Sequence, residues 1–226
     1  MPIETYLIGF GKSFLFALAT LLPILNPTAT APVFLSLTSG ATTATRAVLA
    51  TRIARNVFLL LGAAMIAGSP VLNFFGISLP VVRLAGGLLV ATTAWRLLNS
   101  TDAGVQRAAE FAEGYTPEMA RRQAFYPLTF PIACGPGSIA AAITVGASLH
   151  DPRLSLRAVH IAGALPALAV IAVAVFVCLR FALQLLRPLG ETGTAVFMRM
   201  TAFILLCLGV QIMWDGVFEL FNQLMR

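Results

Sequence analysis

The feature that most constrains this chain is the length of its uncharged stretches. The sequence has 33 consecutive uncharged positions after Lys12 and 27 after Arg55. Further uncharged stretches of 28 and 22 positions follow Arg122 and Arg157. A helix needs about 20 mostly apolar residues to cross the hydrocarbon core of a bilayer. Each of these stretches can therefore hold a membrane-spanning helix.

Composition supports a membrane protein with about six such helices. Hydrophobic residues make up 58% of the sequence and charged residues only 11%, whereas a soluble domain carries roughly 25% charged residues. A soluble globule could not bury so much apolar surface, but lipid solvates an apolar exterior. We therefore predict an all-α membrane protein. The expected spans are 14–37, 56–72, 79–98, one within 123–150, one within 158–179, and 194–214.

A polar linker at residues 99–122 divides the six spans into two groups of three. The first group occupies residues 1–98 and the second occupies residues 123–226. Because three is an odd number, the second group must enter the bilayer from the opposite side. Inverted repeats of this kind, related by a pseudo-twofold axis in the membrane plane, are the plan of many secondary transporters.

Two pairs of features recur in the same order in the two halves. Pro27 in the first span has a counterpart in Pro136 of the fourth span, 109 positions later. Arg83 in the third span has a counterpart in Arg199 of the sixth span, 116 positions later. Two ordered matches at similar offsets favour an internal repeat.

Basic residues near the span ends predict the orientation. The face richer in Lys and Arg is generally cytoplasmic, and here one face carries nine such residues and the other carries four. Both termini are then expected outside the cytoplasm, in the periplasm of a Gram-negative host. The nine are Arg46, Arg52, Arg55, Arg96, Arg107, Arg121, Arg122, Arg180 and Arg187, and the four are Lys12, Arg153, Arg157 and Arg226.

The same basic residues argue against other function classes. Although the net charge is +6, the basic residues form neither a patch nor a platform with aromatic side chains, so we expect no nucleic-acid partner. The cysteines and histidines lack the spacing of a metal site. No nucleophile and base pair indicates an enzyme. We therefore expect no cofactor, metal or enzymatic activity.

Prolines within spans one and four predict that both helices are interrupted. Proline lacks a backbone donor, and it pushes the preceding residue away from helical geometry. Lipid cannot satisfy the released N–H and C=O groups, so broken backbone must face protein or a watery cavity. Each break also creates a half-helix N-terminus that can receive a carboxylate. The candidate substrate-binding residues are Asn26, Pro27, Thr28, Thr30, Gly135, Pro136, Gly137 and Ser138.

If the two breaks meet at the repeat interface, they form a small site near the bilayer midplane. No acidic residue is near either break, so a zwitterion or neutral solute fits better than an inorganic cation. The small side chains of Ala29, Ala31, Gly135 and Gly137 favour a small ligand. The alternative is that both prolines only kink their helices for packing, because proline and glycine are common in transmembrane helices.

Arg83 and Arg199 are the next candidates, because an arginine inside a span is costly. They would gate the pathway or orient a carboxylate. Both lie close to a span end, so snorkelling of the side chain to the interface is an equal alternative.

Four sets of motifs resemble the MarC family of bacterial inner-membrane proteins, which is grouped with neutral amino acid transporters of six spans. They extend in order over nearly the whole chain. They are Leu-Pro-Ile-Leu-Asn-Pro at 22–27, Phe-Gly-Ile-Ser-Leu-Pro at 75–80 with Arg-Leu-Ala-Gly-Gly at 83–87, Pro-Leu at 127–128 with Gly-Pro-Gly-Ser-Ile at 135–139, and Arg199 with Leu-Gly-Val-Gln at 208–211 and Gly216.

The resemblance implies two inverted three-helix repeats with discontinuous first and fourth helices, and transport of a small neutral amino acid such as glycine or alanine. Residues 127–134, which read Pro-Leu-Thr-Phe-Pro-Ile-Ala-Cys, depart from the family pattern and leave the substrate open. We predict an inner-membrane secondary transporter that works by alternating access, with a small neutral amino acid and the bilayer as partners. A homo-oligomer is left open. The alternatives are a scaffold or assembly partner without transport, and an exporter of another small solute or a drug.

Overall fold

A computed structural model describes residues 3–38, 40–99, 123–149 and 153–225. These residues are helical almost throughout and include no β-strand. Five helices are long and apolar enough to cross a membrane, and a bent pair of shorter helices provides a sixth span if it is counted as one. The prediction of an all-α protein with about six membrane spans is confirmed.

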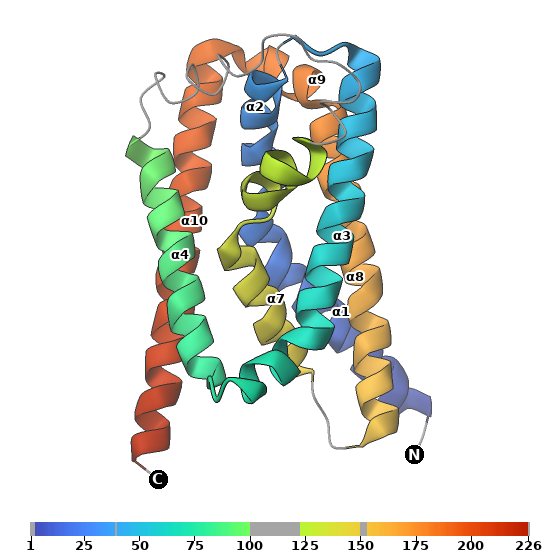
Figure 1. The fold of residues 1–226 in the computed structure, drawn as a ribbon, viewed down its shortest axis with the longest axis vertical. Coiled ribbons are helices and arrows are strands. Elements are labelled where there is room, and N and C mark those ends of the chain that lie inside the picture. Colours follow the sequence, from blue (N-terminus) through green and yellow to red (C-terminus); the bar gives the residue numbers. More distant parts are fainter. Residues whose placement is uncertain (1–2, 39, 100–122, 150–152, 226) are drawn as a thin grey trace.

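The chain crosses the structure in alternating directions, so that both termini lie at one end (Figure 1). We call this the terminal end, and the opposite end, where residues 99 and 123 lie, the linker end. The first half contains α1 (Ile3–Leu25), α2 (Pro27–Leu37), α3 (Thr43–Phe74) and α4 (Leu79–Asn99). The second half contains η1 (Ala124–Ala133), α7 (Pro136–Ser148), α8 (Leu154–Arg180), α9 (Ala182–Leu186), η2 (Arg187–Leu189) and α10 (Gly190–Leu224).

Several helices are longer than their predicted spans. α1 begins at Ile3, ahead of the predicted start at 14, and α8 occupies Leu154–Arg180 rather than a part of 158–179. α3 was expected over 56–72 but occupies 43–74, and α10 was expected over 194–214 but occupies 190–224. Charged residues end an apolar stretch without ending a helix, which continues until a cap or a turn. At the start of α3 the Thr42 hydroxyl accepts a hydrogen bond from the Thr45 N–H at 3.2 Å, which is a typical N-cap.

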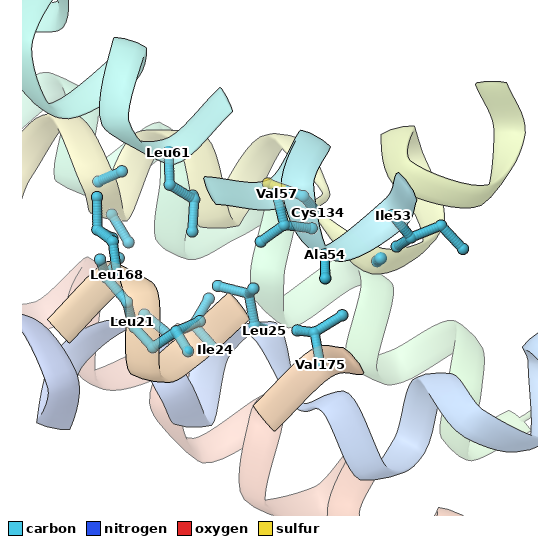
Figure 2. Packing of buried hydrophobic residues seen from close by; sticks show 14 of the residues in the cluster. Leu21, Ile24, Leu25, Ile53, Ala54, Val57, Leu61, Cys134, Leu168 and Val175 are labelled. Carbon is cyan, nitrogen blue, oxygen red and sulfur yellow. The ribbon is translucent and has the colours of Figure 1, made fainter. Parts of the chain in front are cut away.

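The interior is built from the two broken spans and from α3 and α8, the helices against which they pack. α1 and α2 pack along α8, whereas η1 and α7 pack along α3. α3 and α8 also pack on each other. Figure 2 shows part of the resulting core, in which Leu21 of α1, Val57 and Leu61 of α3, and Leu168 of α8 are fully or almost fully buried.

α4 and α10 form an antiparallel pair along most of their lengths, and α4 also packs on α7. Gly87 and Gly209 allow the two backbones to approach closely, because a Cβ atom at Gly209 would lie 2.6 Å from the Ala91 nitrogen. Small residues commonly permit such contacts between membrane helices. The outward face of α10 exposes large apolar side chains, including Phe203 and Ile204, which lipid would solvate.

The polar linker predicted at 99–122 lies outside the described residues except for Asn99, which ends α4. Arg107, Arg121, Arg122 and Arg226, which entered the orientation argument, also lie outside them. The division of the chain at this linker stays a prediction.

Candidate functional site

The first break separates α1 from α2 at Asn26. Asn26 has a positive φ of 46°, a left-handed conformation that asparagine tolerates better than most residues. Its side-chain oxygen accepts hydrogen bonds from the Thr28 hydroxyl at 3.1 Å and from the Ala29 N–H at 3.3 Å. The Thr30 hydroxyl donates to the Asn26 carbonyl at 3.2 Å. Asn26 therefore caps α2, and Pro27 occupies the first helical position, which suits a residue without an N–H.

The second break separates η1 from α7, and the two axes are bent by 71°. Gly135 is the N-cap of α7 and Pro136 is its first residue, but no side chain caps this helix. The Ser138 and Ile139 N–H groups donate to the Gly135 carbonyl at 3.0 and 3.2 Å. No hydrogen bond joins the Gly137 N–H or the Ser138 hydroxyl to another described residue. Ser138 is only 5% exposed, so its hydroxyl is a polar group in a largely buried place.

Helix η1 is more disrupted than the sequence analysis predicted. Tyr126 and Phe130 leave helical geometry, and each precedes a proline, which disfavours helical geometry in the residue before it. The Cys134 N–H is satisfied by the Thr129 carbonyl at 2.8 Å. The second broken span is therefore irregular over most of the segment that leads to Gly135.

Two polar residues at η1, Thr129 within it and Asn56 of α3 beside it, were not among the site residues predicted from the sequence. The Asn56 side chain of α3 donates to the Thr129 hydroxyl at 3.3 Å, and that hydroxyl donates to the Ala124 carbonyl at 2.6 Å. Thr129 is completely buried. Asn56 could have been noticed in the sequence, because it is a polar residue in an apolar stretch and lies near the middle of α3.

The two breaks lie side by side inside the molecule. α1 contacts α7, and α2 contacts η1, so the half-helices of the two spans meet at the same level (Figure 1). Buried residues on both sides, including Leu25 and Cys134, belong to one core cluster (Figure 2). The structure thus brings the predicted residues of spans one and four into one region.

α7 is held closely against α4. A Cβ atom at Gly137 would collide with a methyl group of Val90, and one at Gly86 would lie 2.5 Å from the Cβ of Ala140. These contacts leave no room for larger side chains at either glycine. The corresponding packing of α2 on α10 is much sparser.

The two span arginines lie away from the breaks. Arg83, in the first part of α4 at the terminal end, forms an ion pair with Glu219 of α10. Arg199 is exposed on the part of α10 nearer the linker end. Neither side chain is hydrogen-bonded to a described residue of the two breaks. Their gating or orienting role stays a prediction.

A metal centre finds no support in the described part of the chain, which has no group of three His, Cys, Asp or Glu side chains that could hold an ion. The two breaks offer backbone N–H and C=O groups, hydroxyls and one carboxamide instead. Such an arrangement can bind a small polar molecule by hydrogen bonds and by the partial charge of a helix end.

Comparison with known proteins identifies the family. The model of the MarC family of integral membrane proteins matches residues 11–221. The chain belongs to the MarC family. The resemblance inferred from its motifs is confirmed.

This chain is similar to inner membrane proteins named MarC over almost their whole length. The chain is 34% identical to MarC of Salmonella typhimurium and 33% identical to MarC of Citrobacter koseri, each over 212 residues. It is 30% identical to MarC of Escherichia coli O1:K1 over 211 residues. Each match covers 92% of this chain and 96% of the relative. No solved structure matches the chain significantly. This MarC family protein is thus an integral, multi-pass protein of the inner membrane.

Proposed function

We propose that this MarC family protein is a secondary carrier for a small neutral amino acid such as glycine or alanine. The observation that carries the proposal is the uncapped N-terminus of α7, which lies within a membrane span beside a second helix break. A polar, partly positive group in such a place is costly unless a partner satisfies it. The carboxylate of an amino acid is a suitable partner.

The residues at the breaks suit the two ends of a zwitterion. The Gly137 N–H and the Ser138 hydroxyl would donate to the carboxylate. Pro27 leaves the Pro23 carbonyl without its helical donor, and no hydrogen bond to this carbonyl is found among the described residues. Released carbonyls of this kind would accept from the ammonium group. Small residues such as Ala29 and Gly135 leave space for a short side chain.

We further propose that the two halves are inverted repeats that alternate access to this site. The helices of the first half run opposite to their counterparts in the second half (Figure 1). Each broken span also packs along the middle span of the other half: α1 and α2 along α8, and η1 and α7 along α3. Inverted repeats with broken helices are typical of secondary transporters.

α7 and α2 pack unequally on their neighbours, which favours the interpretation that this structure is the state closed at the terminal end. α7 extends from the breaks to the terminal end and packs tightly on α4, whereas α2 extends to the linker end and touches α10 sparsely. By the distribution of basic residues, the linker end would be cytoplasmic and both termini periplasmic. The opposite state would release α7 from α4 and bring α2 closer to α10.

Uptake of radiolabelled glycine and alanine into proteoliposomes tests the proposal. The full chain should accumulate or exchange either amino acid, and Ser138→Ala should reduce this activity. Ser148→Ala is the matched control, because the Ser148 hydroxyl lies on the same helix and is satisfied by the Thr144 carbonyl at 2.9 Å. The absence of uptake and exchange for both amino acids in folded protein would reject the proposal in favour of a scaffold or an exporter of other solutes.

A further inference from the structure

A cavity of about 250 Å³ lies at the terminal end, away from the two breaks. It is formed where α3 and α7 end, where α8 begins, and beside the turn between α3 and α4. Its walls are largely apolar and include Ile66, Leu149 and Ile161. A hydrogen bond between the His160 ring and the Leu149 carbonyl, at 3.3 Å, ties α8 to the end of α7 and so steadies one wall.

One charged residue lines this cavity. Arg157 is half-buried, and its guanidinium forms no hydrogen bond or ion pair with another described residue. An arginine is always ionised, and a partly buried cation without a partner is unfavourable. The described lining includes no acidic side chain. The cavity therefore presents a cation that an anionic ligand could pair with.

Ser69 adds a second unsatisfied polar group to the same wall. Its hydroxyl is buried and has no hydrogen-bond partner among the described residues. Hydroxyls elsewhere in the spans, such as those of Thr38, Thr93 and Thr144, donate to the carbonyl four residues earlier, as is usual in helices. Ser69 departs from this pattern, and the nearby Asn73 amide can also donate. A buried polar group without a protein partner is satisfied by a water, an ion or a ligand, or else stays strained.

The size and lining of the cavity define its ligand. Pockets for drug-sized molecules have volumes of roughly 300–1,000 Å³, so a cavity of about 250 Å³ suits a smaller molecule. The guanidinium plane matches a carboxylate, which it binds with two parallel hydrogen bonds. The apolar walls suit a short aliphatic chain.

We propose that this cavity is a second binding site, which takes a small carboxylate with a short apolar chain and holds it by Arg157. It is separated from the breaks by tight packing of α7 on α3, because a Cβ atom at Gly146 would collide with the Met65 carbonyl and one at Gly68 would collide with Ile143. The site goes beyond the proposed carrier function and does not depend on it.

Binding of propionate to the full chain, in nanodiscs of phosphatidylcholine, tests this site. Propionamide has the same shape without the charge and should bind at least about tenfold more weakly, because it cannot form the charge-assisted pair with the guanidinium. Arg157→Gln should weaken propionate binding by a similar factor. Arg153→Gln, which removes the same charge from a residue outside the lining, should leave it within about twofold.

Two further variants separate this proposal from the carrier function. In Ser138→Ala, which alters the break, the part of the propionate binding that depends on Arg157 should remain, so the cavity would be supported even if uptake of glycine and alanine failed. Ala147→Leu, which fills the cavity, should abolish propionate binding, while the purified variant should stay folded and monodisperse. Unchanged binding in Arg157→Gln, or loss of binding in Ser138→Ala alone, would overturn the proposal. Competition by phosphatidylglycerol would assign the cavity to a lipid headgroup and would also overturn it.

Discussion

The two broken helices begin their second segments in chemically different ways. At the first break Asn26 supplies a side-chain oxygen to the first turn of α2. At the second break Gly135 has no side chain to supply, and α7 begins uncapped. Both breaks arise from a proline at the first helical position, yet only the second leaves an N-terminus that can receive a ligand. A cap satisfied from within stabilises its own helix, whereas an uncapped helix end leaves N–H groups that can bind a ligand.

The sharpest test of this comparison is Gly137→Ala. The added methyl group would collide with Val90, so α7 should move from α4 and the first turn of α7 should shift. Overpacking of this kind typically costs about 1–3 kcal/mol of stability. We expect uptake of alanine to fall more than about tenfold, which exceeds the loss expected from one hydrogen bond.

Gly11→Ala is the control for this substitution, because a Cβ atom at Gly11 has no neighbour within 4 Å. It should leave uptake unchanged and raise the free energy of unfolding by at most about 1 kcal/mol, because alanine is a better helix former than glycine. Normal uptake by folded Gly137→Ala protein would show that the position of the α7 N-terminus does not matter.

Ser138→Ala should have the next largest effect. It removes a hydroxyl that has no partner among the described residues, so stability should hardly change. If the hydroxyl donates to a carboxylate, the KM for alanine uptake should rise about tenfold. Thermal unfolding and concentration-dependent uptake, measured on the same preparations, separate the two effects. A loss of stability with an unchanged KM would make Ser138 a structural residue.

Asn26→Ala should show the reverse pattern. Loss of the cap should lower the free energy of unfolding by about 1 kcal/mol, and alanine also fits a positive φ poorly. Asn26→Gly keeps that backbone conformation accessible and should cost only a few tenths of a kcal/mol. Thermal unfolding would rank the two variants. A large rise in KM for Asn26→Gly, with stability preserved, would show that the Asn26 side chain also binds substrate directly.

The smallest effect is expected for Arg83→Gln. Its ion pair with Glu219 is partly exposed, and exposed pairs contribute about 0–1 kcal/mol. A double-mutant cycle with Glu219→Gln, measured by thermal unfolding, should give a coupling energy within that range. Loss of uptake in Arg83→Gln, with uptake retained in Glu219→Gln, would instead support the gating role predicted from the sequence.

Much of the fold was predictable because a bilayer restricts the backbone structures that can cross it. Uncharged stretches identified the spans, and the prolines identified both breaks. The difference between the breaks was also present in the sequence, since Asn26 before Pro27 is a typical N-cap followed by a first-turn proline. The role of either break in binding substrate stays a prediction.

Contacts between distant residues could not be predicted in the same way. Asn56 and Thr129 are 73 positions apart, and Arg83 and Glu219 are 136 apart. Such pairs depend on how whole helices pack, which local spacing does not specify. The cavity at the terminal end is of the same kind, because Ser69 and Arg157 come from helices in different halves of the chain.

An experimental structure of the protein with bound L-alanine tests the central claim most directly. The account predicts density for the amino acid between the two breaks, with its carboxylate within hydrogen-bonding distance of the Gly137 N–H and the Ser138 hydroxyl. A structure in which α7 keeps a bare first turn while alanine occupies another part of the molecule would contradict it.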